Sequence, residues 1–141
     1  MNSTATDLLT WLVTKIRALG YDVYQGVAPA GAAYPFVTVN FVTSVPSYSL
    51  GGDSGIRIDE WAIAISIFCR DRDAANLCIQ YDQKIGAAIE GQFNQVQAQT
   101  TIMNWDRGET IGPTWVEHEN NWMLVANWHP RAYADGTLAA E

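Results

Sequence analysis

The chain has 141 residues, of which 48% are hydrophobic and only 16% are charged, and its net charge is −7. This length suits one domain with its own core, and the composition excludes a disordered chain. The acidic excess disfavours sequence-specific nucleic-acid binding and attachment to an anionic membrane, because both need clustered cations. No apolar run reaches the roughly 18–20 residues of a membrane span. The two cysteines, Cys69 and Cys78, match no zinc or redox spacing and are expected to be reduced and buried.

The first segment predicts an amphipathic helix. Apolar residues from Leu8 to Leu19 recur at the spacing of one helical face. Thr4 or Thr6 is expected to cap its start, and Gly20 is expected to take the left-handed conformation that ends it.

Strands follow this helix. Residues 21–25 predict a short extended piece, 26–33 a loop and 36–43 a strand rich in β-branched and aromatic residues. Residues 44–55 predict a long loop, and loops of this size are often functional. Residues 56–70 give the clearest strand pattern, with strict alternation.

The two faces of the predicted strand over 56–70 differ in size. One face is bulky and is expected to form core, with Trp61, Ile63, Ile65, Ile67 and Cys69. The other face is small enough for a helix to approach closely, with Ala62, Ala64, Ser66 and Phe68.

A second helix follows, capped by Asp71 or Asp73, with an apolar stripe from Ala74 to Ile89 and its end near Gly91. Residues 96–105 alternate again and predict another strand.

The last third of the chain predicts more extended structure. Residues 106–114 contain two glycines and a proline and predict a turn. Two extended pieces follow, over 115–119 and 121–131. The order of elements indicates an α+β fold, in which a mainly antiparallel sheet packs with two α-helices.

We divide the chain into a single domain over residues 1–131 and a flexible C-terminal arm over 132–141. The arm is small and polar, and it is expected to be mobile unless a partner holds it.

The tetrapeptide Gly52-Asp53-Ser54-Gly55 is similar to the sequence around the nucleophile of chymotrypsin-like proteases. That chemistry needs a histidine beside the serine and an acid behind the histidine. The two histidines, His118 and His129, both follow the serine here, and the chain is too short for two barrels. A glycine-rich turn is the favoured interpretation, with a small hydrolase using Ser54 as the alternative.

Glu117, His118 and Glu119 form the other polar cluster. On a strand the two carboxylates share a face and the imidazole points away from them, which makes a poor metal site. We therefore predict no metal, no cofactor and no catalytic residue.

The tryptophans are not interleaved with basic residues, so stacking of nucleic-acid bases is disfavoured. Core or subunit-interface packing is expected instead. We assign four of them to subunit contacts: Trp105, Trp115, Trp122 and Trp128.

The order of features over residues 5–130 resembles the tail terminator, or tail-to-head joining, proteins of bacteriophages. The similarity lies in the leading helix and in a set of short motifs. These are Asp22-Val23-Tyr24, Ala28-Pro29, Tyr34-Pro35-Phe36-Val37, the Gly-Asp turn within 44–55, the long strand with its capped helix, and the aromatic strand over 122–128. Residues 106–120 and the Ala-rich end match no part of this pattern.

The resemblance implies a structural virion protein of the phage neck without enzymatic activity. Such proteins form rings, commonly six-fold, that cap the finished tail tube, stop its polymerisation and present a surface to the head. The implied partners are further copies of the chain, the tail tube protein and a head-side connector, with DNA passing through the lumen. The implied location is the virion, with assembly in the host cytoplasm.

We predict that the loop over 44–55 lines the lumen or touches the next ring, through Pro46, Tyr48, Leu50, Gly52 and Asp53. The arm over 132–141 is expected to order on a neighbouring subunit or on the head-side partner. The alternatives are another head-tail connector or minor tail component, the hydrolase, and a monomeric cytosolic adaptor.

Overall fold

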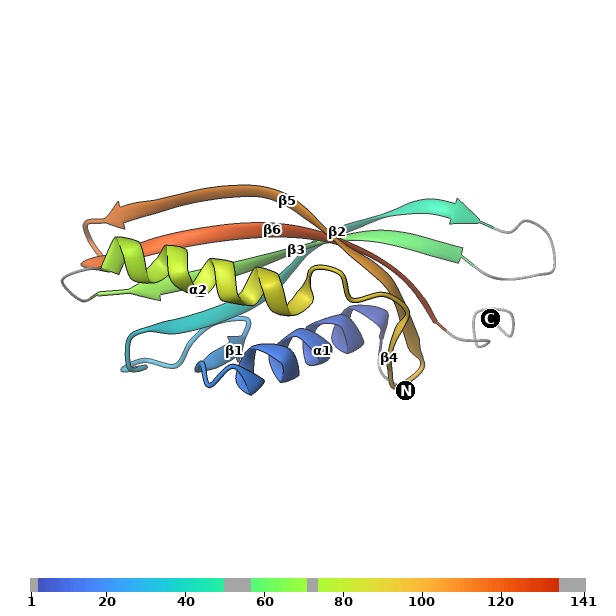
Figure 1. Cartoon of the computed structure of the whole chain (residues 1–141), viewed down its shortest axis with the longest axis horizontal. Helices are drawn as coiled ribbons and strands as arrows, with labels where there is room; N and C mark the ends of the chain where they lie inside the picture. Colours follow the sequence, from blue (N-terminus) through green and yellow to red (C-terminus); the bar gives the residue numbers. More distant parts are fainter. Residues whose placement is uncertain (1–2, 50–56, 71–73, 135–141) are drawn as a thin grey trace.

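The computed structural model describes residues 3–49, 57–70 and 74–134. Their elements follow one another as helix, strands, helix and strands (Figure 1). In chain order these are α1 (Thr4–Ala18), β1 (Val23–Gln25), β2 (Phe36–Ser49), β3 (Arg57–Cys69), α2 (Ala74–Ile89), β4 (Gln95–Gln97), β5 (Thr100–Val116) and β6 (Asn121–Ala134).

The six strands form one sheet in the order β1-β2-β3-β6-β5-β4. Among the described strands only β1 and β2 pair in parallel, and every other pair is antiparallel. This confirms the predicted α+β fold, a mainly antiparallel sheet with two helices in one domain. Neither described helix is long and apolar enough to cross a membrane.

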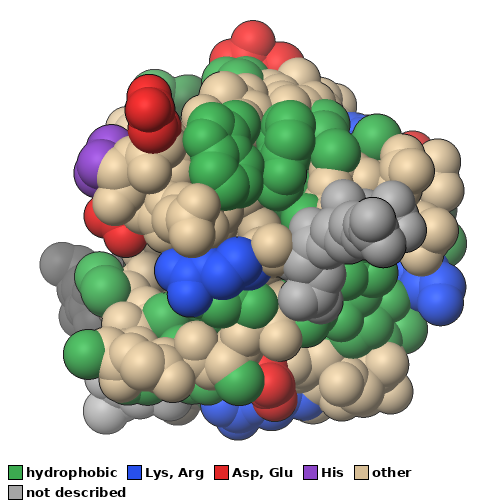
Figure 2. All heavy atoms as spheres, turned by 90° about the vertical axis from the view of Figure 1, so that its left-hand side faces the viewer, with side chains coloured by type: hydrophobic (Ala, Val, Ile, Leu, Met, Phe, Trp, Pro, Cys, Tyr) green, Lys and Arg blue, Asp and Glu red, His purple; other side chains and the backbone are tan. Residues whose placement is uncertain are grey.

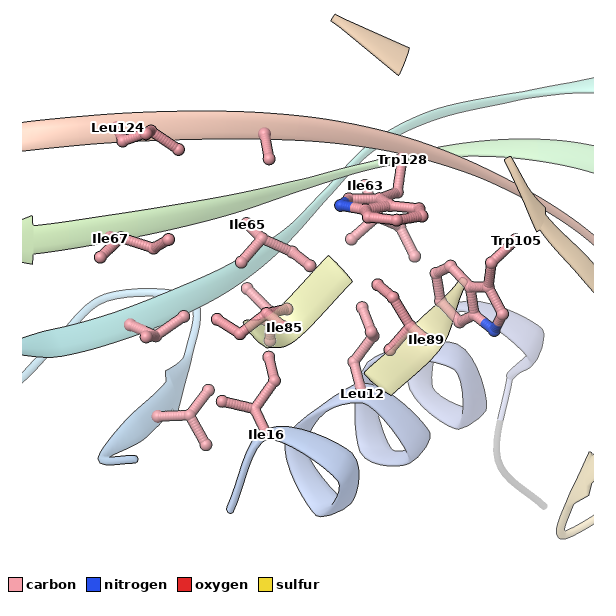
Figure 3. Close-up of a cluster of buried hydrophobic side chains, with 14 of the residues drawn as sticks. Leu12, Ile16, Ile63, Ile65, Ile67, Ile85, Ile89, Trp105, Leu124 and Trp128 are labelled. Carbon is pink, nitrogen blue, oxygen red and sulfur yellow. The ribbon is translucent and has the colours of Figure 1, made fainter. Parts of the chain in front are cut away.

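Both helices pack on the same face of the sheet (Figures 1 and 3). Leu12 of α1 and Ile85 of α2 point into one cluster with the buried face of β3 and β6, which includes Ile65 and Trp128. Complete burial of each such side chain contributes about 1.5–3 kcal/mol. The bulky face of β3 is therefore core, as predicted.

The prediction of a helix on the small face of β3 is wrong. Ala62, Ala64 and Ser66 remain half-buried, and among the described elements both helices lie on the other face. The bulky isoleucines of β3 offer more apolar area to α1 and α2 than the small side chains do, so both helices pack on the isoleucine face.

The predicted cap of α1, Thr4 or Thr6, is wrong. The Ser3 hydroxyl accepts a hydrogen bond from the Thr6 amide at 3.1 Å, so Ser3 is the N-cap. Gly20 has φ +88°, as predicted for the residue that ends the helix. The caps predicted for α2, Asp71 and Asp73, lie outside the described residues.

The predicted long loop over 44–55 is wrong in its first half. β2 continues to Ser49 and stays paired with β3 as far as Ser49 opposite Arg57, through two register shifts. Ser44 is tolerated here because a half-exposed strand accepts polar side chains on its wet face. Residues 50–56 lie outside the described part of the chain.

The predicted strand over 96–105 is two strands joined by a tight turn at Ala98 and Gln99. Ala98 has φ +53°, a conformation that alanine adopts rarely. The turn contains no glycine, asparagine or proline, so the sequence carries no signal for it.

The predicted turn over 106–114 is also wrong, because these residues belong to β5. Its glycines and Pro113 sit at register shifts against β6, between Arg107 and Thr110 and between Ile111 and Thr114. Bulges accommodate such residues in a strand whose other edge is unpaired.

The predicted arm begins too early. Ala132 and Tyr133 belong to β6, which continues to Ala134 and pairs there with Thr100. Ala132 is buried as part of the core, opposite Asp59 of β3 and Ile102 of β5. Residues 135–141 lie outside the described part of the chain.

Candidate interaction surfaces

Two long strand edges lie on opposite sides of the sheet. β1 covers β2 only over residues 37–39, so the outer edge of β2 has no described strand beside it from residue 40 to 49. β4 covers β5 only over residues 100–102, so the outer edge of β5 is unpaired by any described strand from residue 104 to 116. We call these the β2 edge (40–49) and the β5 edge (104–116).

Apolar side chains are exposed at both edges. Phe41, Val42 and Val45 are about half exposed on β2, and Ile111 and Trp115 are similarly exposed on β5. The edge segment of β2 and its partner segment of β3 also extend beyond both helices, toward the right in Figure 1. Unpaired backbone groups next to apolar side chains favour pairing with another chain.

The residues predicted to project from a loop are now placed in part. Pro46 and Tyr48 belong to β2, where they lie opposite Asp59 and Ile58 of β3. Leu50, Gly52 and Asp53 lie outside the described residues, as does Ser54 of the alternative hydrolase. The role predicted for this segment at a lumen or a second ring stays a prediction.

The four tryptophans assigned to subunit contacts divide into two pairs. Trp105 and Trp128 are buried inside the subunit, and Trp105 stacks on Trp11 with ring centroids 5.1 Å apart. These two therefore have no surface to offer a neighbour, because helix packing already covers them. Trp115 and Trp122 meet edge to face at 5.6 Å and remain partly exposed, so their interface role stays a prediction.

One end of the sheet carries a cluster of polar contacts around Arg70. Its Nε donates to the carbonyl of Asn120 at 3.0 Å, and one Nη donates to the carbonyl of Glu119 at 3.1 Å. The guanidinium lies 4.2 Å from the centre of the Tyr34 ring. Figure 2 faces this end and shows a basic group in the middle of the surface between apolar side chains. Arg70 thereby fixes the β5–β6 turn to the segment before β2.

A groove of about 390 Å³ opens beside this cluster, on the helix-free face. The Tyr34 hydroxyl accepts hydrogen bonds from Arg70 at 3.2 Å and from the Asn121 side-chain amide at 3.0 Å. Asn121 is buried, and its Oδ1 has no partner among the described residues. Aromatic walls from Phe36 and Phe68 complete the groove.

The sequence reasoning missed an ion pair that ties α2 to the sheet. Arg107 of β5 donates to the carboxylate of Asp82 and lies over the Trp128 ring, 5.3 Å from its centre. Gly86 leaves room for this, because a Cβ there would be 2.6 Å from an Arg107 Nη atom. Arg107 is 21 or more positions away in the sequence from Asp82, Gly86 and Trp128, so no local motif signals these contacts.

A second missed contact joins the start of α1 to β5. Asp7 is buried, and its carboxylate accepts a hydrogen bond from the Thr100 hydroxyl at 2.6 Å. The other Asp7 oxygen has no partner among the described residues. An acidic residue in the first turn of a helix is a stabilising signal, but nothing in the sequence indicates its burial.

No cluster of histidine, cysteine and carboxylate residues suited to a metal is found in the described part of the chain. His118 is exposed and lies 3.8 Å from Glu119, which is a surface pair. Cys69 and Cys78 are free and buried, and the structure brings them together. A hydrogen bond from Cys69 lowers the pKa of Cys78 below its usual value, against the effect of burial.

Comparison with known proteins supports the fold. No family model matches the chain, and no curated protein matches its sequence. A chain from the virion of a native gene transfer agent particle is 14% identical, with a TM-score of 0.73 over 95% of this chain and 100% of that one. A second solved structure, named only by an identifier, is 9% identical with a TM-score of 0.53 over 90% and 88% of the two chains. At these identities the likeness establishes a shared fold.

Proposed function

We propose that this chain is a structural virion protein of a phage-like particle. It forms a ring, six-fold by analogy with the tail terminator proteins it resembles, that caps the tail tube, stops tube polymerisation and joins the tail to the head. The observation that carries the proposal is the fold likeness to a chain of a gene transfer agent virion, which extends over 95% of this chain and all of that one.

The surface of the chain supports self-association. The β2 edge and the β5 edge lie on opposite sides of one sheet, and each carries exposed apolar side chains. Contacts through two different surfaces of one subunit are heterologous, and they produce a closed ring when the rotation between subunits divides a full turn.

The charge of the chain suits a ring through which DNA passes. Six copies with a net charge of −7 would carry −42. A negatively charged lumen repels the phosphate backbone, so DNA would move through without binding. The partners of such a ring are the tail tube protein on one side and a head-side connector on the other. The protein would be in the virion, and in the host cytoplasm before assembly.

The test uses particles assembled with and without this protein. Without it, electron micrographs should show tubes longer than normal and heads that carry no tail, and adding the purified protein should restore both. Normal tube length and normal attachment without the protein would contradict the proposal.

Two further results would identify the alternatives. Cross-linking to the head-side connector but never to the tube protein would indicate another neck component. Ser54→Ala tests the hydrolase, because a catalytic serine would be required for function whereas a turn residue would not.

A further inference from the structure

We propose that neighbouring subunits join by pairing the β2 edge of one copy with the β5 edge of the next, so that the sheet continues across the contact. The occupant of each edge is therefore a second copy of this chain. The inference rests on the proposed function, because it supposes that the chain forms a ring.

The backbone of β2 shows which groups are offered to a neighbour. The Val37 amide donates to Asp22 at 2.9 Å, and the Val39 carbonyl accepts from Gly26 at 3.0 Å, so these residues face the outer side. Phe41, two residues further, directs its amide and carbonyl to the same side. β1 has ended there, and no other described strand pairs with this part of β2.

The backbone of β5 offers groups in the same way. The last contact on its outer side is the Asn94 amide, which donates to the Met103 carbonyl at 3.1 Å. From Asn104 onward β5 is paired on its inner side with β6, and no described strand lies on its outer side. Each subunit thus has two edges without a described partner strand, the β2 edge and the β5 edge, and each can pair with a different neighbouring subunit.

Strand direction favours the pairing. β2, β3, β6 and β5 are successive antiparallel neighbours, so β2 and β5 run in opposite directions within one subunit. If the next subunit follows in the same orientation, its β2 meets the β5 edge as an antiparallel strand. That is the more stable arrangement of a strand pair, and it needs no change in the fold.

The edges are interrupted, which explains how the free subunit can avoid uncontrolled association. Pro46 removes a backbone donor from the β2 edge, and Pro113 lies in a register shift of the β5 edge. The register shifts in both strands leave uninterrupted stretches of at most about four residues, and short edges pair weakly. Pairing would then become stable when several contacts form together on the end of a tube.

Hydrogen exchange on the free subunit and on tube ends capped by it tests the inference. The amide of Phe41 and amides within 104–107 should exchange at least about tenfold more slowly in the capped state, because both edges gain hydrogen bonds. Amides of Val37 and Val39, which face the existing β1, should change little. Amide protection on β2 without protection on β5 would indicate two-fold pairing of β2 with itself and would overturn the inference.

Two substitutions separate this inference from the proposed function. Val45→Lys places a charge at the β2 edge and should abolish capping, whereas Ile79→Lys, at a side chain 38% exposed on α2 and on neither strand edge, should cap normally. Circular dichroism of both variants establishes that they fold. Tubes capped normally by Val45→Lys, or capped by the unmodified protein without protection of the edges, would overturn edge pairing and leave the ring intact. Failure of the unmodified protein to cap any tube would overturn the proposed function itself.

Discussion

Trp128 and Trp115 lie on adjacent strands of one sheet but in opposite environments. Trp128 of β6 is completely buried beneath α2 and contacts Arg107, whereas Trp115 of β5 is 43% exposed and contacts only Trp122 among the described aromatic rings. The difference is the helix cover, which reaches Trp105 on β5 but not the exposed end of that strand where Trp115 lies. Burial under the helices therefore explains the apolar residues of the covered region, whereas the apolar residues at the edges are not buried within the subunit.

This comparison divides the molecule into a part that determines stability and a part that is available for contact. Apolar residues under the helices lose nearly all their contact with water within the subunit. Those on the β2 and β5 edges would lose it only against another chain. Substitutions in the two regions should then affect different measurements, stability in the first and assembly in the second.

Trp128→Ala should give the largest loss of stability. Removal of a fully buried tryptophan leaves a cavity in the core, and the expected loss is about 3–5 kcal/mol in the free energy of unfolding. Chemical denaturation measures it. Trp115→Ala is the matched control on the adjacent strand, and it should cost about 1 kcal/mol, the value of its contact with Trp122. Equal losses for the two variants would contradict the division between core and edge.

Asp82→Ala should have the second largest effect. It leaves the half-buried guanidinium of Arg107 without its carboxylate, and the expected loss is about 1–3 kcal/mol. Asp82→Asn keeps an acceptor oxygen and should lose less. Thermal unfolding of the two variants measures the difference, and no loss in either would show that the ion pair does not fix α2 to β5.

Alkaline pH should weaken the contact between the segment after α1 and α2. Tyr21 and Tyr81 stack with ring centroids 3.8 Å apart, and burial raises the pKa of both, with the charge of Tyr21 adding to the increase at Tyr81. A raised pKa in the folded state means that the folded chain holds these protons more tightly. The stability they contribute is complete below about pH 10, the usual tyrosine pKa, and is lost as the pH rises through the folded values.

Denaturation curves measured from pH 8 to pH 11.5 would show this decline, within the range where the phenols titrate. The double variant Tyr21→Phe and Tyr81→Phe should unfold with a smaller dependence on pH over that range. An unchanged slope in the double variant would assign the decline to other groups.

Val45→Lys should have the smallest effect on stability. The side chain is 53% exposed on the β2 edge, so the free energy of unfolding should change by less than about 0.5 kcal/mol. Chemical denaturation of the isolated subunit checks this. A loss above 1.5 kcal/mol would place Val45 in the core instead, by the usual cost of such substitutions.

The long periodic segments were predictable from the sequence, and the departures from periodicity were not. The stripe from Leu8 to Ile16 and the alternation from Ile63 to Cys69 gave a helix and a core strand, because burial on one face requires that spacing. The glycines and the proline in 106–114 predicted a turn, but in the structure these residues belong to a bulged strand. A bulge depends on the partner strand β6, which local sequence does not describe.

The candidate surfaces were predictable only in part. The exposed position of Trp115 agrees with a role in contacts, but Trp105 and Trp128 have the same residue type and are core. Residue type alone cannot distinguish them, because tryptophan is common in cores and at interfaces. The β2 and β5 edges carry no motif at all, since an edge is defined by the strand that is missing beside it.

The sequence by itself determined the α+β class, the two helices, the core face of β3 and the acidic charge, because these follow from periodicity and composition along the chain. Only the tertiary structure decided that both helices share one face, that Arg107 meets Asp82, and that β1 and β4 are too short to cover their neighbours. Those features depend on contacts between residues far apart in the chain, and such contacts form only when the whole sheet is assembled.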